Sequence, residues 1–107
     1  MTNEDLVTGF EHGTLAPATF GHREHVRVAW VYLTRYGRAG AEQRMLDGLR
    51  AFAARAGKPS KFDAALTRAW LAAIDEARGA VPAAASFDEL VAARPALLDR
   101  SALVVPR

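Results

Sequence analysis

The feature that most restricts the fold is a helical pattern of apolar side chains in residues 20–36, because it also contains two of the three histidines. At about 3.6 residues per turn, one side of this segment carries the residues His22, His25, Ala29, Leu33 and Tyr36. Imidazoles on a core-facing side need hydrogen bonds, a metal or a ligand. The segment therefore predicts a helix with a site on its inner face.

The rest of the chain also has helical spacing, separated by glycine and proline. Short connections join the central segments, at 38–40 after Gly37 and again before Pro59. Helices joined so closely normally run antiparallel. We expect an all-α fold, a small bundle of three central antiparallel helices with short flanking N- and C-terminal helices. The predicted central helices are 21–36, 40–56 and 60–78. A short helix that starts with Thr2 or Asn3 as its cap and ends at Gly13 precedes them, and a short one that starts at Ser86 and is ended or interrupted by Pro95 follows.

Cap residues place the starts of three of these helices. Thr19 is the candidate cap for the helix that begins at 20–22. The pattern Ser60-x-x-Asp63 has the form of a capping box, in which Asp63 would accept the amide hydrogen of Ser60. The pattern Ser86-x-x-Glu89 has the same form and predicts the last helix.

Composition places the chain among water-soluble globules. Half of the residues are hydrophobic and 24% are charged, without an apolar run long enough to cross a membrane. We expect one domain over 1–107, located in the cytoplasm, because a secretory signal and cysteines are missing. The residues 96–107 form a tail that is too apolar to be free, so it would pack on the bundle or on a second copy in a homo-oligomer.

The basic residues do not form a nucleic-acid footprint. The net charge is +2, and the arginines are interleaved with acidic residues along the chain. Nucleic-acid binding normally uses a one-sided basic stripe. A nucleic-acid partner is therefore disfavoured.

The antiparallel arrangement predicts where a site would form. The N-termini of the helices 21–36 and 60–78 and the C-terminus of 40–56 would share one end of the bundle, which brings together His22, His25 and Asp63. Both lysines, Lys58 and Lys61, belong to the same end. Helix N-termini and lysines favour negative charge. We expect a pocket there for a small anion.

Two roles are open for the central residues of this pocket. His22, His25 and Asp63 are candidate catalytic groups, or candidate ligands of a divalent metal, although His-x-x-His alone is a weak metal motif. Asp63 could equally be only a helix cap. The candidate substrate-binding residues are Lys61, Tyr32, Tyr36, Thr67 and Trp70. Aromatic residues at helical spacing also have an alternative role in the core.

Several chemistries lack support. There is no cysteine nucleophile, no glycine-rich phosphate loop, no nucleotide or flavin signature and no serine in a nucleophile elbow. Acid–base or metal-assisted chemistry on a small anionic substrate remains one hypothesis. The other is a non-catalytic ligand-binding or accessory protein in which the histidine and aspartate side chains form a structural cluster.

Two stretches carry a resemblance to known proteins. Phe20 to Trp30 and Lys61 to Trp70 resemble a group of small uncharacterised bacterial helical proteins, in which F-x-H-x-x-H-(V/L)-x-x-A-W precedes K-aromatic-x-x-x-aliphatic-T-R-A-W. In that group histidine often stands at the positions of Gly21 and Asp63. The glycine argues against a three-histidine site here, whereas Asp63 keeps a metal ligand or proton acceptor. The resemblance covers about two helices and implies a shared helical fold and pocket, without naming a reaction.

Overall fold

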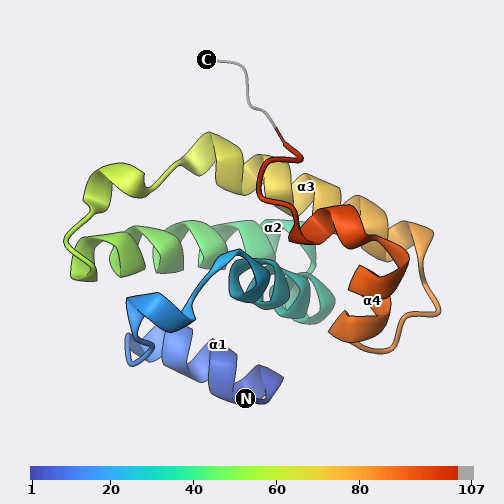
Figure 1. Ribbon diagram of the computed structural model, residues 1–107, viewed down its shortest axis with the longest axis horizontal. Coiled ribbons are helices and arrows are strands. Elements are labelled where there is room, and N and C mark those ends of the chain that lie inside the picture. Colours follow the sequence, from blue (N-terminus) through green and yellow to red (C-terminus); the bar gives the residue numbers. More distant parts are fainter. Residues whose placement is uncertain (104–107) are drawn as a thin grey trace.

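The computed structural model describes residues 1–103, and these residues form helices without any strand (Figure 1). The predicted all-α fold is confirmed. The α-helices are α1 (Asn3–His12), α2 (His22–Arg55), α3 (Ala64–Ala80) and α4 (Phe87–Ala93). Short 3-10 segments are η1 (Pro17–Thr19), η2 (Pro59–Lys61) and η3 (Pro95–Leu98).

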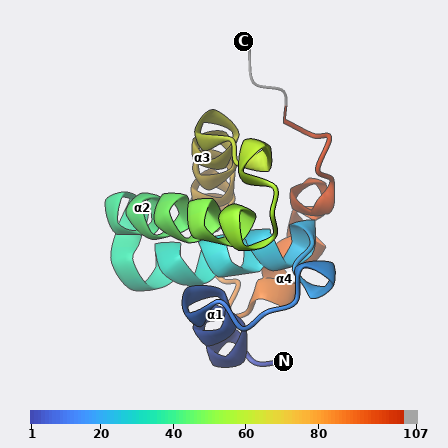
Figure 2. The ribbon, with the colours of Figure 1, turned by 90° about the vertical axis from the view of Figure 1, so that its left-hand side faces the viewer.

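Helix α2 contains both of the first two predicted central helices. Gly37 has φ 74° and ψ −175°, and it is the only non-helical position between residues 22 and 55. This backbone region is open essentially to glycine alone. The chain therefore reverses at one residue, and the parts 22–36 and 38–55 run back alongside each other (Figure 2). The expected connection over 38–40 is wrong, because these residues are already helical.

The second reversal brings α3 across the pair. Gly57, with φ 73°, and η2 turn the chain after α2, and α3 then runs back over α2 (Figure 1). Helix α1 covers another side of the first part of α2, while α4 and η3 return beside the start of α2. Three central helical units with short flanking helices therefore match the expected bundle.

Two of the three predicted caps are wrong. Thr19 donates its hydroxyl hydrogen to the carbonyl oxygen of Ala16, at 2.8 Å, inside η1. Helix α2 instead begins after Gly21, whose amide donates to Oε1 of Glu24 at 2.9 Å. The nearby Arg27 donates from Nε to Oδ1 of Asn3 at 2.7 Å. Thr19 is the last residue of the 3-10 turn that begins at Pro17, so its hydroxyl group bonds within that turn and does not cap α2.

The capping box at Ser60 is wrong for the same reason. Ser60 lies inside η2, which begins at Pro59, and Asp63 is itself the cap of α3. Its Oδ1 accepts the amide hydrogen of Leu66 at 3.0 Å. The cap at Ser86 is confirmed, since its hydroxyl oxygen accepts the amide hydrogen of Glu89 at 3.2 Å.

The C-terminal segment packs on the bundle of its own chain. Leu97 is buried in the core cluster, and its carbonyl oxygen contacts a ring nitrogen of His22 at 2.9 Å. Leu98 is exposed. Of the described tail residues only Leu97 is buried and 98–102 are exposed, so the packing of 96–107 on the bundle or on a partner stays a prediction beyond this contact. Val104 and Val105 lie outside the described residues, and association with a second copy stays a prediction.

Candidate functional site

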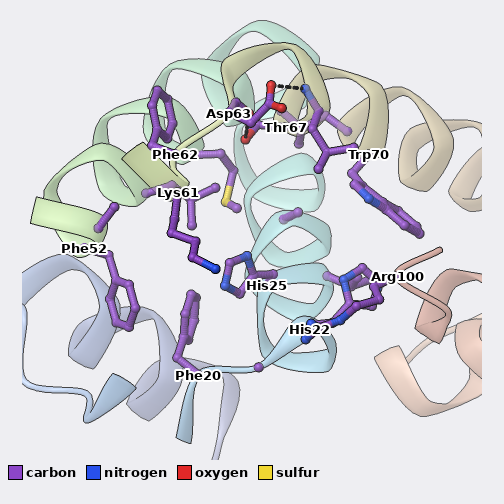
Figure 3. Close-up of a pocket in the computed structure, with 18 of the residues that line it drawn as sticks. Phe20, His22, His25, Phe52, Lys61, Phe62, Asp63, Thr67, Trp70 and Arg100 are labelled. Atoms are coloured by element: carbon purple, nitrogen blue, oxygen red, sulfur yellow. Dashed lines mark hydrogen bonds between the residues drawn. The ribbon is translucent and has the colours of Figure 1, made fainter. Parts of the chain in front are cut away.

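A cavity of about 670 Å³ lies where the start of α2, the end of α2, η2 and the start of α3 meet (Figure 3). Its size is within the range of pockets that hold small organic ligands. Its apolar lining comes mainly from α2 and α3, with Pro17, Phe20 and Phe62 from the connecting segments. The start of α2 and the later stretch from the end of α2 to α3 therefore enclose one space, at the end of the bundle that the connections predicted.

Six of the eight predicted site residues line this cavity. They are His22, His25, Lys61, Asp63, Thr67 and Trp70. Figure 3 shows the amine of Lys61 and the ring of His25 pointing toward each other across the cavity. The stretches 20–30 and 61–70 thus line the cavity from opposite sides.

Tyr32 and Tyr36 lie elsewhere, so their predicted role in substrate binding is not supported by their positions. Tyr32 is buried against α1 and donates its hydroxyl hydrogen to Oε2 of Glu11 at 2.6 Å. Burial raises the pKa of Tyr32, which keeps this donor protonated. Tyr36 is 46% exposed and lies under the guanidinium of Arg44, 3.6 Å from the ring centroid. Helix α1 packs on the side of α2 that bears Tyr32. The helical spacing in the sequence does not indicate on which side of α2 this helix docks.

His25 is the most unusual polar group of the cavity. Burial, and next the neighbouring His22, lower the pKa of His25 from 6.5 to about 4, so its imidazole is uncharged at neutral pH. The ring packs on Phe20 with 4.4 Å between centroids. Within residues 1–103 its ring nitrogens have no hydrogen-bond partner. An uncharged donor and acceptor is thus available inside an apolar space.

His22 has a structural contact that His25 lacks. Its Nε2 donates to the carbonyl oxygen of Leu97, because a carbonyl can only accept. Its ring also meets Trp70 edge-on, with 4.6 Å between centroids. His22 therefore links the C-terminal segment to the cavity wall and has less freedom than His25 to bind a ligand.

Asp63 lines the cavity and caps α3 at the same time. Figure 3 shows its carboxylate turned toward the first turn of α3, away from the centre of the cavity. Across residues 1–103, no three histidine, cysteine, aspartate or glutamate side chains are placed so that they could hold one metal ion. The set of His22, His25 and Asp63 proposed from the sequence for a divalent metal is therefore not assembled.

Cations surround the mouth of the cavity. Lys58, Lys61 and Arg100 line it, and all three are exposed residues that form no ion pair within the described part of the chain. Arg100 was missed by the sequence reasoning, which placed it only in an apolar tail. The apolar tail could have indicated Arg100. If the tail packs on the bundle beside His22, Arg100 lies near the cavity as well. Arg23 is directed elsewhere and pairs with Asp88 at 2.6 Å.

The two helix N-termini contribute less positive potential than the sequence suggested. Glu24 already accepts the amide hydrogen of Gly21 before α2, and Asp63 accepts that of Leu66 in α3. Each terminus thus has a carboxylate of its own. The positive charge of the cavity comes from side chains instead.

No protein-family model, curated protein or solved structure matches this chain. No helix within residues 1–103 combines the length and the apolar character that a membrane span requires. What the cavity can do must therefore be argued from its own residues.

Proposed function

We propose that this chain binds a small organic acid in the cavity between α2, η2 and α3. The observation that carries the proposal is the combination of an apolar space of about 670 Å³ with three cations, Lys58, Lys61 and Arg100, and a single carboxylate, Asp63. An apolar body gains from burial, and a carboxylate gains from the cations. A ligand with a basic group would meet like charges at the mouth.

His25 gives the bound acid a polar partner inside the cavity. An uncharged imidazole that has no hydrogen-bond partner within residues 1–103 can donate to a carboxylate or accept from a protonated one. A bound anion also favours the charged imidazolium, so it raises the pKa of His25 from about 4 toward neutrality. Ligand binding and the basicity of His25 are thereby linked.

The test is a titration with a panel of carboxylates, with Trp70 fluorescence as the signal. The variant Trp30→Phe removes the second tryptophan, which packs on Phe87 outside the cavity, with 6.1 Å between ring centroids. In that background, carboxylates should bind and change the emission of Trp70. The matching alcohols and amines should bind more weakly.

Two substitutions separate the cavity cations from overall charge. Lys61→Ala should weaken carboxylate binding about tenfold or more, as expected for the loss of a charge-assisted hydrogen bond. Arg38→Ala removes one positive charge from an exposed site outside the cavity and should leave affinity unchanged. Equal losses in both variants, or no binding by any acid, would contradict the proposal.

A second candidate function is proton transfer on the bound acid. The observation that favours it is the uncharged imidazole of His25. Its uncharged ring points to Lys61, so it could take a proton from a bound ligand while the ammonium stabilises the negative charge that develops. The test is hydrogen–deuterium exchange on bound acids in heavy water, followed by proton NMR. Exchange that disappears in His25→Phe supports catalysis. Binding without exchange leaves a binding protein.

A further inference from the structure

The cavity changes in polarity from its mouth to its floor. The cationic side chains of Lys58, Lys61 and Arg100 belong to exposed residues at the mouth. The floor is made of side chains that are at most 3% exposed, namely Val26, Ala29, Met45, Leu71 and Ile74. A ligand with a charged end and an apolar end therefore has only one favourable orientation, with the charge outward.

Aromatic rings line the walls and not the floor. Phe20 packs against Phe52 with 4.9 Å between centroids, and Trp70 is held by His22 at 4.6 Å. Both pairs belong to the walls, above the floor side chains. The space beneath them is bounded by aliphatic side chains and Met45, whose surface suits a flexible chain.

The floor also limits how many charges the ligand carries. None of its five side chains has a donor for a carboxylate, and an unpaired charge buried there would be very costly. A second carboxylate at the far end of a ligand would therefore be excluded. The groups that could hold a carboxylate are more exposed than the floor, since Lys61 is exposed and His25 is only partly buried.

We infer that the ligand is an aliphatic monocarboxylic acid. Its chain enters the cavity first, and its carboxylate is held at the mouth by Lys58 and Lys61. This inference rests on the proposed function and adds the class and the direction of the ligand. It distinguishes the cavity from a site for aromatic acids, dicarboxylic acids or neutral lipids, each of which becomes an outcome of the test.

The experiment is a series of straight-chain acids from butanoate to dodecanoate, measured by calorimetry or by Trp70 fluorescence. Affinity should rise about fourfold with each buried methylene until the chain fills the cavity. Alcohols of the same length should bind at least tenfold more weakly, and the dicarboxylates at least a hundredfold more weakly. Phenyl-substituted acids should bind no better than chain acids of equal size.

A floor variant tests the direction of entry. Ala29→Leu adds side-chain carbons to the floor, so it should weaken the binding of the longest acids and shift the best chain length down by about three methylenes. Butanoate binding should not change. Ala39→Leu makes the same substitution at an exposed position outside the cavity and should leave the whole series unaltered.

The outcomes separate this inference from the proposal beneath it. If acids bind without dependence on chain length, if dicarboxylates bind equally well, or if Ala29→Leu shifts nothing while folded, the inference is overturned and the proposed function stands. If no acid binds, both fail. Circular dichroism reports folding, and Ala29→Val, with a smaller shift expected, replaces a leucine variant that does not fold.

Discussion

The first part of α2 has two faces that the fold treats in opposite ways. Toward α1 it is filled, since Phe10 packs near Tyr32 and both are 1% exposed. Toward η2 and α3 the same helix presents His25 and Ala29, and the cavity remains. One helix can thus stabilise the fold with one face and leave room for a ligand with the other.

The largest expected effect comes from aromatic residues on the two faces. Phe10→Ala should lower the free energy of unfolding by about 3–5 kcal/mol, because Phe10 is 1% exposed. Trp70→Ala should lower it by only about 2 kcal/mol, since one side of Trp70 already borders the cavity. Urea unfolding measures both. Equal losses would show that the two faces are packed alike.

The next effect is a pH dependence that belongs to the cavity face. The pKa of His25 is about 4 in the folded chain and 6.5 when unperturbed, so the unfolded state binds more protons between these values. The free energy of unfolding is therefore highest above pH 6.5 as far as His25 is concerned. It falls as the pH is lowered toward 4, by about 3 kcal/mol in total. The lowered pKa values of Asp5 and Asp99 act at lower pH.

Urea titrations from pH 7 to 4 test this dependence with two variants. His25→Phe should flatten the curve between pH 6.5 and 4, and His12→Asn, at an exposed histidine, is the matched control. A wild-type curve without a slope in this window would show that His25 is not buried as described.

Enlarging an alanine on each side gives a smaller contrast. Ala41 is fully buried away from the cavity, so Ala41→Leu should destabilise the fold by about 1–3 kcal/mol through overpacking. Ala29→Leu should change stability by less than about 1 kcal/mol, because its new atoms enter the cavity. Thermal unfolding compares the two variants. A larger loss of stability for Ala29→Leu than for Ala41→Leu would show that the cavity does not lie beside Ala29.

The smallest contrast concerns single polar groups. Tyr32→Phe removes the hydrogen bond to Glu11 and should cost about 1 kcal/mol. His25→Phe at pH 7 removes no hydrogen bond within the described residues and keeps a ring against Phe20, so its cost should be nearer zero. Chemical unfolding at pH 7 is the measurement, and a larger loss for His25→Phe would reveal a polar contact at its ring.

Much of the helical arrangement could be predicted because helical spacing and glycine positions are local signals. The short connections also sufficed to bring His22, His25 and Asp63 to one cavity. For α1 the sequence left Thr2 and Asn3 open as caps, and the cap is Thr2, whose hydroxyl oxygen accepts the amide hydrogen of Asp5 at 3.0 Å.

The errors arose where local alternatives compete or where distant packing decides. At 17–19 and 59–61 a proline begins a 3-10 turn, which displaces the caps expected at Thr19 and Ser60. The position of Tyr32 depends on where α1 docks, and that of Arg100 on where the C-terminal segment lies. Such tertiary contacts leave no periodic signal in the sequence.

The one-residue reversal at Gly37 also limits how this site can be altered. One residue inserted into 22–36 would turn the rest of that part by about 100° and move it by about 1.5 Å, with no loop before 38–55 to absorb the change. The connection 81–86 between α3 and α4, in contrast, is a six-residue loop in which Val81 and Ala84 pack against the core and the other residues are not part of it. A family of variants with new ligand preferences should therefore be sought by exchanging side chains in α2, while changes of chain length are best confined to the segment after α3.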